Sequence, residues 1–216
     1  MIVHVIDPAS VADEEAALLL SVAEEEQAAR FRFEKDARHW RACRGALRSI
    51  LGDALGVAPA SVVLRLAEYG KPQLCPPFDH LHFNLSHCRE LALVALACDG
   101  PIGVDIEAED RGRSLLGCEH AFCHPDEMAI LPESEQDRAS VLLDLWTGKE
   151  ALLKALGTGM SLAPETVSMV PPGRQGVGSH PRLQEFRLER LEHSRLENYF
   201  ARIAVPVGTR EILIVA

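Results

Sequence analysis

The spacing of apolar residues in the first quarter of the chain predicts two amphipathic helices. Apolar residues recur at helical intervals over residues 10–29, where Ser10 followed by Asp13 resembles a capping box at the start of the first helix. The second helix is expected over residues 36–55, and Gly56 is placed to end it. One of its faces carries arginines, and the opposite face is apolar, with Trp40, Cys43, Leu47 and Leu51.

Short apolar segments bounded by Gly, Pro and Asp predict strands in the rest of the chain. They are expected within residues 61–70, 82–98 and 101–109, and GKPQLCPP, between the first two, is expected to be a loop. A long helix should follow over residues 134–156, ended by Gly157 and Gly159. After a surface loop, PPGRQGVGSHP, three segments alternate like antiparallel strands, at residues 182–191, 199–207 and 211–216. The fold class is therefore α+β.

The composition of the chain favours a globular, cytoplasmic protein. With 216 residues, 47% of them hydrophobic, the chain is long enough to bury a core without disulfides. Its six cysteines contain no CxxC pair, which favours a reduced setting. The first residues lack the basic region of a secretory signal, and no apolar run approaches the roughly 18 residues that a membrane helix needs. We therefore expect neither secretion nor membrane insertion.

The charge of the chain argues against nucleic acid as a partner. There are 32 acidic and 22 basic side chains, and the formal net charge is −10. Any phosphate site must therefore be local. Basic residues do cluster between Arg30 and Arg48, and the ordinary interpretation of such a run is a solvated helix face.

Two acidic residues lie two positions apart in the expected strand GVDIE. Asp105 and Glu107 should project from one face of this strand, about 6–7 Å apart at the backbone, while Val104 and Ile106 face the core. Carboxylates held on one face repel each other unless a cation lies between them, and such hard oxygen ligands suit Mg²⁺. The simpler interpretation is a half-exposed strand whose acidic residues face water.

A second pair of charged residues lies on the long helix expected over residues 134–156. Glu150 and Lys154 are one helical turn apart, which is also the spacing of an ordinary surface ion pair. If Glu150 turned toward Asp105 and Glu107, the three acids would form a magnesium site with vacant positions for phosphate oxygens. Lys154 would then lie beside the phosphates, whereas Lys149 points elsewhere on the helix.

Two further groups have weaker chemical signals. His87 follows Ser86 at the end of an expected strand, where a histidine is commonly structural, and the GxSxG elbow of a serine hydrolase is absent. Four possible zinc ligands lie too close together along the chain to converge easily on one ion, namely Cys118, His120, Cys123 and His124. Pro125 and the acids after it are more typical of a helix start.

The order of four motifs identifies a family. The chain reads EYGKP, FNLSH, IGVDIE and WTGKEALLK, and this series resembles the phosphopantetheinyl transferases of the surfactin-synthetase-activating type, the larger class of roughly double length. The resemblance covers residues 31–161. It implies a monomeric pseudo-dimer of two similar α+β halves, each a small, mostly antiparallel sheet packed with a long helix. Residues 1–100 would form the nucleotide side of a coenzyme A cleft, and residues 101–216 would carry the metal and catalytic residues.

The resemblance also implies roles for individual residues. Asp105, Glu107 and Glu150 would hold Mg²⁺ with the pyrophosphate of coenzyme A, and Lys154 would contact the phosphates. The remaining coenzyme A contacts would come from Lys71, Pro72, Ser86, His87 and, with a less certain role, Lys149. Glu150, directly or through a water, would accept the proton of a carrier-protein serine, and His87 is the alternative base.

One segment departs from the family pattern. Related enzymes usually carry basic residues ahead of the RFxxxKDA-like segment that help to hold the 3′-phosphate, but this chain has EEEQAARF. We expect Arg30, Arg32, Lys35 or an arginine of the next helix, such as Arg44, to replace them. Two other functions fit the same residues less fully: another magnesium-dependent phosphotransfer or phosphohydrolase enzyme, and a coenzyme A-binding module without turnover. The larger class tends to serve secondary metabolism, and the sequence leaves open which carrier protein is the client.

Overall fold

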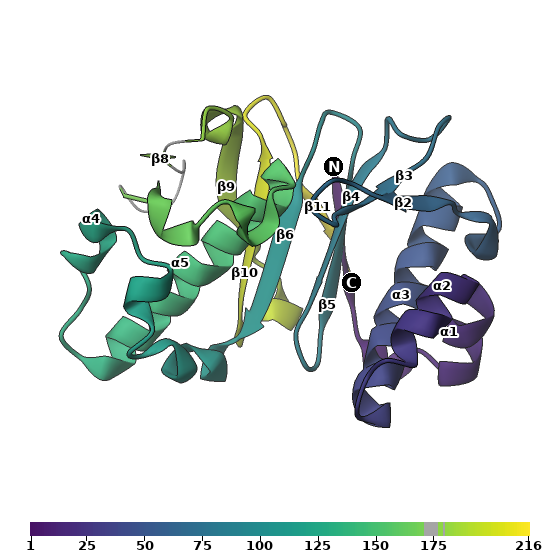
Figure 1. Ribbon diagram of the computed structural model, residues 1–216, viewed down its shortest axis with the longest axis horizontal. Helices are drawn as coiled ribbons and strands as arrows, with labels where there is room; N and C mark the ends of the chain where they lie inside the picture. Colours follow the sequence, from purple (N-terminus) through teal and green to yellow (C-terminus); the bar gives the residue numbers. More distant parts are fainter. Residues whose placement is uncertain (171–176, 179) are drawn as a thin grey trace.

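Four layers of secondary structure make up the molecule (Figure 1). The computed structural model describes residues 1–170, 177–178 and 180–216. Helices α1, α2 and α3 form one outer layer, helix α5 lies in the opposite outer layer, and two sheets lie between them. The α+β class and its two halves, each with a sheet packed against a long helix, are confirmed.

The first predicted helix is two short helices. Helix α1 spans Asp13–Leu19 and α2 spans Val22–Ala28. They are separate because the backbone is extended at Leu20, which ends α1, and Ser21 caps α2: its side chain accepts from the Glu24 N–H, and the Glu24 carboxylate accepts from the Ser21 N–H. The capping box is therefore at Ser21, not at Ser10, whose hydroxyl donates to the Asp7 carbonyl.

Helix α3, Glu34–Leu55, packs on the N-terminal sheet as predicted. It ends at Gly56, which has a φ of 67°, a left-handed conformation that glycine adopts without a steric cost. Leu47 and Leu51 are fully buried against strands β4, His82–His87, and β5, Ala92–Ala97. The expected strand at residues 82–98 is thus an antiparallel hairpin of two strands.

Two strands at opposite ends of the chain complete this sheet, whose order is β11-β1-β5-β4. Strand β1, Ile2–Ile6, pairs antiparallel with β5 and was not predicted. Strand β11, Leu213–Val215, pairs with β1 in parallel, so the expected antiparallel arrangement of the last segment is wrong. A strand of three residues carries no signal of its partner, and this pairing is long-range.

The GKPQLCPP segment, expected to be a loop, contains strand β3. Strands β2, Leu64–Leu66, and β3, Pro72–Leu74, form an antiparallel ribbon. The turn lies earlier than expected, because Gly70 adopts a φ of 82° and the Ala67 N–H donates to the Lys71 carbonyl. Extended backbone can therefore begin directly after Lys71.

The C-terminal sheet has the order β6-β10-β9, and all its pairs are antiparallel. Its strands are Gly103–Ala108, Tyr199–Pro206 and Phe186–Arg190, and helix α5, Glu135–Leu156, packs on it. As predicted, Val104 and Ile106 face the core, where they meet side chains of the N-terminal sheet. Ser134 caps α5, and Gly157, with a φ of 76°, ends it.

Short elements connect these layers. Helix α4 spans Pro125–Met128, as the Pro125 signal predicts, and strands β7 and β8 span Val167–Ser168 and Val177–Gly178. Turns of 3₁₀ helix lie at Pro8–Ser10, Pro59–Ser61, Glu109–Leu115, Glu119–Ala121, Gly159–Ser161, Pro164–Thr166, Leu183–Glu185 and Ser194–Leu196. Most of the predicted surface loop PPGRQGVGSHP, at 171–176 and 179, lies outside the described residues. Across the described part of the chain, every helix is too short or too polar to cross a bilayer.

A close contact at Gly103 brings α5 onto β6. A Cβ atom at this position would lie 2.1 Å from the Ala151 carbonyl oxygen and 2.3 Å from the Ala155 nitrogen. Only glycine therefore lets the helix backbone approach the strand this closely. The contact places Glu150 and Lys154 beside the acidic face of β6.

Candidate active site

Lys154 joins three elements from both halves of the chain. Its Nζ donates to Asp105 Oδ1 on β6 at 2.6 Å and to Ser86 Oγ on β4 at 3.0 Å. The Ser86 hydroxyl in turn donates to the same Asp105 oxygen at 2.8 Å. The interpretation of Lys154 as the partner of Glu150 in a surface ion pair is therefore wrong.

The second oxygen of Asp105 has no partner among the described residues. Asp105 is 5% exposed, and its Oδ2 is buried without a hydrogen bond. A buried carboxylate oxygen without a partner is costly, because it has lost its water and gained nothing in exchange. The half-exposed strand is thus the wrong interpretation of GVDIE, and the unpartnered oxygen fits a site for a cation.

The two glutamates lie in the same electrostatic environment. Burial, followed by repulsion from Asp105, raises the pKa of Glu107 to about 7, although Arg111 Nε lies 2.9 Å from its carboxylate. Burial also raises the pKa of Glu150, and Asp105 adds to the shift while Lys154 opposes it. The three acids do not form a compact cluster whose oxygens all lie within 4.8 Å of one another, as judged over the residues described. Their hard oxygens and mutual repulsion nonetheless fit Mg²⁺.

Lys71 ties the EYGKP turn to the end of α5. Its Nζ donates to the carbonyl of Ile102 at 2.7 Å and to the carbonyl of Lys154 at 2.6 Å. Burial, with the positive charges of Arg182 and Lys154, lowers the pKa of Lys71 to about 8. Pro72, the next residue, opens β3. The ammonium group, from the N-terminal half, thus binds two backbone carbonyls of the C-terminal half.

Ser86 and His87 point to opposite faces, as the strand predicts. While Ser86 contacts Asp105, His87 Nδ1 lies 3.3 Å from Nε2 of His39 on α3. Loss of solvent around the ring, followed by the nearby His39, lowers the pKa of His87 to about 4. Arg44 is also close enough to contribute to this shift. His87 is therefore neutral at physiological pH.

Three arginines of α3 lie against acids of the helices that cover them, so the solvated-face interpretation is wrong for these three, whereas Arg30, Arg32, Lys35 and Arg38 are exposed as it predicts. Arg41 pairs with Asp13 at 2.8 Å, and Arg48, only 2% exposed, pairs with Glu24 at 2.6 Å. Arg44 stacks over Trp40, and its Nε lies 3.7 Å from the Glu24 carboxylate, so it forms an ion pair but is buried without a hydrogen bond among the described residues. Of these three arginines, Arg44 retains an unused donor.

Lys149 lies away from the acidic site. It is 1% exposed and forms a buried ion pair with Glu127 at 2.6 Å, and its Nζ also donates to the carbonyls of Phe122 and Pro164. We therefore do not assign Lys149 to coenzyme A. The four possible zinc ligands do not gather either: Cys118 is exposed, Cys123 is buried, and the His124 ring caps α4. All six cysteines are free thiols.

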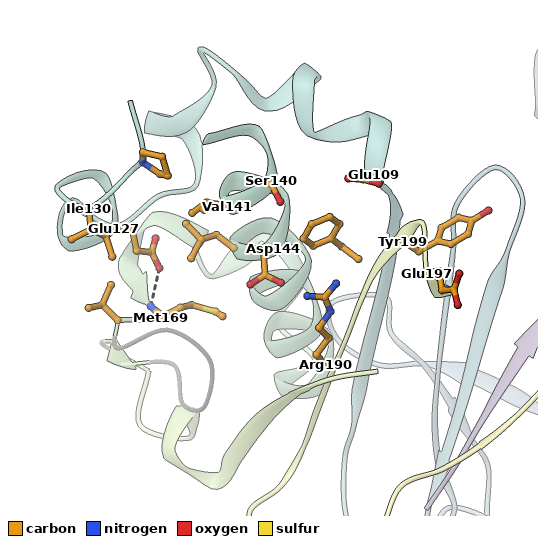
Figure 2. A pocket seen from close by; sticks show the side chains of 14 residues that line it. Glu109, Glu127, Ile130, Ser140, Val141, Asp144, Met169, Arg190, Glu197 and Tyr199 are labelled. Atoms are coloured by element: carbon orange, nitrogen blue, oxygen red, sulfur yellow. Dashed lines mark hydrogen bonds between the residues drawn. The ribbon is translucent and has the colours of Figure 1, made fainter. Parts of the chain in front are cut away.

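A cavity of about 540 Å³ opens on the C-terminal half (Figure 2). Asp144 of α5 and Arg190 of β9 point toward it, and Glu127 at its edge accepts a hydrogen bond from the Met169 N–H at 2.8 Å. Its lining includes Tyr199 and Phe200 but none of the acids Asp105, Glu107 and Glu150. The cavity is thus separate from the acidic site.

Comparison with known proteins identifies both halves of the chain. Residues 101–204 match the model described as "4'-phosphopantetheinyl transferase superfamily", and residues 7–99 match the model described as "4'-phosphopantetheinyl transferase, N-terminal". The 4'-phosphopantetheinyl transferase HetI of Nostoc sp. PCC 7120 is 36% identical over 162 residues, which are 74% of this chain and 68% of the relative. This chain belongs to the 4′-phosphopantetheinyl transferase superfamily. Members of this family use coenzyme A as a substrate.

Other phosphopantetheinyl transferases resemble the chain over a similar extent. A 4'-phosphopantetheinyl transferase of Bacillus subtilis is 30% identical over 169 residues, which are 77% of this chain and 74% of the relative. The 4'-phosphopantetheinyl transferase Sfp of Bacillus subtilis strain 168 is 27% identical over 150 residues, 69% of this chain and 66% of that protein. The family predicted from the four motifs is confirmed.

Several residues of this phosphopantetheinyl transferase make contacts around the site that were not predicted from the sequence. Arg111 pairs with Glu107 from the 3₁₀ turn after β6, at an i,i+4 spacing that was visible in the sequence. His39 and Cys43 also have helical i,i+4 spacing on α3, but nothing local indicates that they face His87. Glu127 was read only as part of a helix start, although it is the partner of Lys149.

Proposed function

We propose that this phosphopantetheinyl transferase moves the 4′-phosphopantetheine arm of coenzyme A onto a serine of an acyl or peptidyl carrier protein and releases 3′,5′-ADP. The supporting observation is the contact of Lys154 with Asp105 and Ser86, which joins a cation, a carboxylate and a hydroxyl from both halves. Phosphoryl transfer depends mainly on positioned reactants and neutralised charge, which such a site supplies.

Asp105, Glu107 and Glu150 would hold Mg²⁺. The unpartnered Asp105 oxygen and the raised pKa values of the two glutamates support this assignment, because burial leaves these carboxylates poorly solvated and the nearby Lys154 and Arg111 compensate only in part. Bound there, the ion would neutralise the diphosphate of coenzyme A. In this proposal residues 101–216 carry the metal and catalytic residues, and residues 1–100 form the nucleotide side. That the protein is a cytoplasmic monomer stays a prediction.

Lys154 and Glu150 would act on the reacting groups. Lys154 would stabilise the departing 3′,5′-ADP as a point charge beside its phosphates. Glu150 would accept the proton of the carrier serine, directly or through a water. His87 is the alternative base, because it is neutral at physiological pH.

The nucleotide side would use residues around β4. His87 and Arg44 would face the 3′-phosphate, and Lys71 and Pro72 would lie beside the nucleotide. Ser86, on the opposite face of β4, would contact coenzyme A from the side of Lys154. Arg44 is supported by its Nε, which lacks a hydrogen bond among the described residues, and by its influence on the pKa of His87. An arginine is well suited to bind phosphate because its guanidinium presents several donors in one plane. Arg44 would thus replace the basic residues that the EEEQAARF segment lacks.

Incubation with Mg²⁺, coenzyme A and a panel of apo carrier proteins tests the function. We expect a carrier to gain the mass of one phosphopantetheine and 3′,5′-ADP to appear in equal amount. Release of phosphate without a change in carrier mass would indicate a phosphohydrolase instead. Binding of coenzyme A without either product would indicate a module without turnover.

Glu150→Gln tests the catalytic assignment. The variant keeps the shape of the side chain but removes its ability to take a proton or to bind a cation as an anion, so kcat should fall about 10²–10⁴-fold. Circular dichroism should remain unchanged. The matched control is Glu135→Gln, because Glu135 is exposed on the first turn of the same helix and should keep full activity. Full activity of Glu150→Gln would remove Glu150 from the mechanism.

A further inference from the structure

Three metal-binding side chains meet where α3 passes the end of β4. His39 and Cys43 come from α3 at i,i+4 spacing, so they share one face of the helix, and His87 is the last residue of β4. One ligand atom from each lies within 4.8 Å of the other two, and no other three histidine, cysteine or acidic side chains converge in this way within the described ranges.

Two of the three distances between these atoms match a tetrahedral metal site. His39 Nε2 lies 3.3 Å from His87 Nδ1 and 3.6 Å from Cys43 Sγ. Zinc bonds of about 2.05 Å to nitrogen and about 2.3 Å to sulfur, at tetrahedral angles, separate two nitrogens by about 3.4 Å and a nitrogen from a sulfur by about 3.6 Å. Both observed separations agree with these values.

Hydrogen bonding alone explains the arrangement poorly. His39 Nε2 faces both His87 Nδ1 and the Cys43 sulfur, but an imidazole nitrogen carries at most one proton. At most one of these contacts can therefore receive a full hydrogen bond from His39, and a thiol is a weak partner in either direction. A cation shared by the three atoms would satisfy all of them at once.

We infer that His39, Cys43 and His87 form a three-ligand site for a borderline divalent metal, with Zn²⁺ as the best fit. Two imidazoles and one thiolate are a ligand set that selects zinc over magnesium or calcium, which prefer oxygen. On binding, the Cys43 thiol would release one proton to solvent, and the fourth position would remain open to water. The site is separate from the three acids proposed for Mg²⁺ and shares only His87 with the proposed nucleotide side.

Cobalt absorption tests the site without coenzyme A or a carrier protein, so a negative result is distinguishable from failure of the proposed function. Co²⁺ is titrated into a Cys98→Ala/Cys118→Ala background, which removes the two exposed thiols. We expect one equivalent of Co²⁺ to produce a thiolate-to-cobalt charge-transfer band and tetrahedral d–d bands, and Zn²⁺ to abolish them. His39→Ala or Cys43→Ala should weaken binding about 100-fold or more, because each removes one of three ligands.

Two cysteine variants are the matched controls. Cys88→Ala removes a half-buried thiol near Cys43, and Cys123→Ala removes a buried thiol in another part of the core, so both should keep the cobalt bands. If Cys43→Ala fails to fold, His39→Gln keeps the test decisive, because His39 is only partly buried. Bands that survive the loss of His39 and of Cys43, or no bands in the background protein, would overturn the site.

Discussion

Lys149 and Lys154 show how strongly the surroundings of a residue decide its role. They lie five positions apart on α5, about 140° apart around the helix axis, so they face different neighbours. Lys154 reaches Asp105 and Ser86 at the junction of the two halves. Lys149 enters the core of the C-terminal half and pairs with Glu127, where both side chains are 1% exposed.

Removing Lys149 should therefore affect stability and not coenzyme A binding. Lys149→Met should lower the free energy of unfolding by about 3–5 kcal/mol, because it leaves the Glu127 carboxylate buried without its cation. Urea denaturation measures this change. Lys149→Met/Glu127→Gln should recover part of the loss, since the unpaired charge is gone while the amide oxygen still accepts from the backbone. A stable Lys149→Met enzyme with a raised Michaelis constant for coenzyme A would contradict this assignment.

At the scale of elements, the active site depends on how closely α5 lies on β6. The contact passes through Gly103, where a Cβ atom would meet the helix backbone at 2.1 Å. Glu150 and Lys154 come from the helix and Asp105 and Glu107 from the strand, so the distance between the two elements sets the distance between the charges.

Gly103→Ala should push α5 away from β6. We expect the free energy of unfolding to fall by about 1–3 kcal/mol or more, because backbone atoms must move to admit the methyl group. Turnover should fall as well, since Lys154 would lose its 2.6 Å contact with Asp105. Gly208→Ala is the control, because nothing lies within 4 Å of a Cβ at that position. Equal stability and turnover in the two variants would contradict the role given to Gly103.

Lys71 should hold the end of α5 to the first half. Lys71→Met should lower the free energy of unfolding by about 1–3 kcal/mol, because the buried carbonyls of Ile102 and Lys154 lose their donor. Lys35→Met, at an exposed lysine, is the control. Thermal and urea unfolding measure both variants.

The effect of Lys71 should also depend on pH. Its pKa is about 8 in the folded protein against an ordinary value of 10.5, so between these values the unfolded chain binds more protons than the native one. The contribution of Lys71 to the free energy of unfolding therefore rises with pH between these two pKa values. The advantage of the wild type over Lys71→Met should increase from pH 8 to 10.5, and an advantage that shrinks would contradict the direction of the shift.

At the scale of the whole molecule, the two halves are joined by more than their chain connection. Side chains from both sheets form one core, with Val3, Val5 and Leu93 on one side and Val104 and Ile106 on the other. Strand β11 then crosses back to pair with β1, so the N-terminal sheet includes residues from the end of the sequence. The proposed coenzyme A site lies where these halves meet, and its geometry depends on their docking.

Ile214→Ala should measure the contribution of this crossing strand. Ile214 packs against the shared core, so its truncation should lower the free energy of unfolding by about 1–2 kcal/mol. Leu213→Ala is the control, because Leu213 is 53% exposed and should change stability by less than about 0.5 kcal/mol. Equal effects in urea denaturation would mean that β11 lies loosely on the sheet.

The elements that sequence predicted well are those whose signals are local. Helices α3 and α5 have long apolar stripes and a glycine at the end, and β6 alternates apolar and acidic residues. Two of the errors concern distant partners: strand β1 was missed, and the segment of β11 was predicted as a strand but with the wrong pairing, because β5 and β1 lie far from them in the sequence. Strand β3 was missed although its partner β2 is local, because the turn at Gly70 lies earlier than expected. The break before α2 was a local signal at Ser21 that a continuous apolar pattern obscured.

The sequence by itself determined the family and the residues that can perform its chemistry. The reason is that the order of the motifs, and the helical or strand spacing of residues within them, can be read directly along the chain. Only the tertiary structure decided which charges meet. It paired Lys154 with Asp105, buried Lys149 with Glu127, and brought His39 and Cys43 to His87. The physical reason is that these contacts join residues 22 to 49 positions apart, and packing between layers, not any local period, sets their distances.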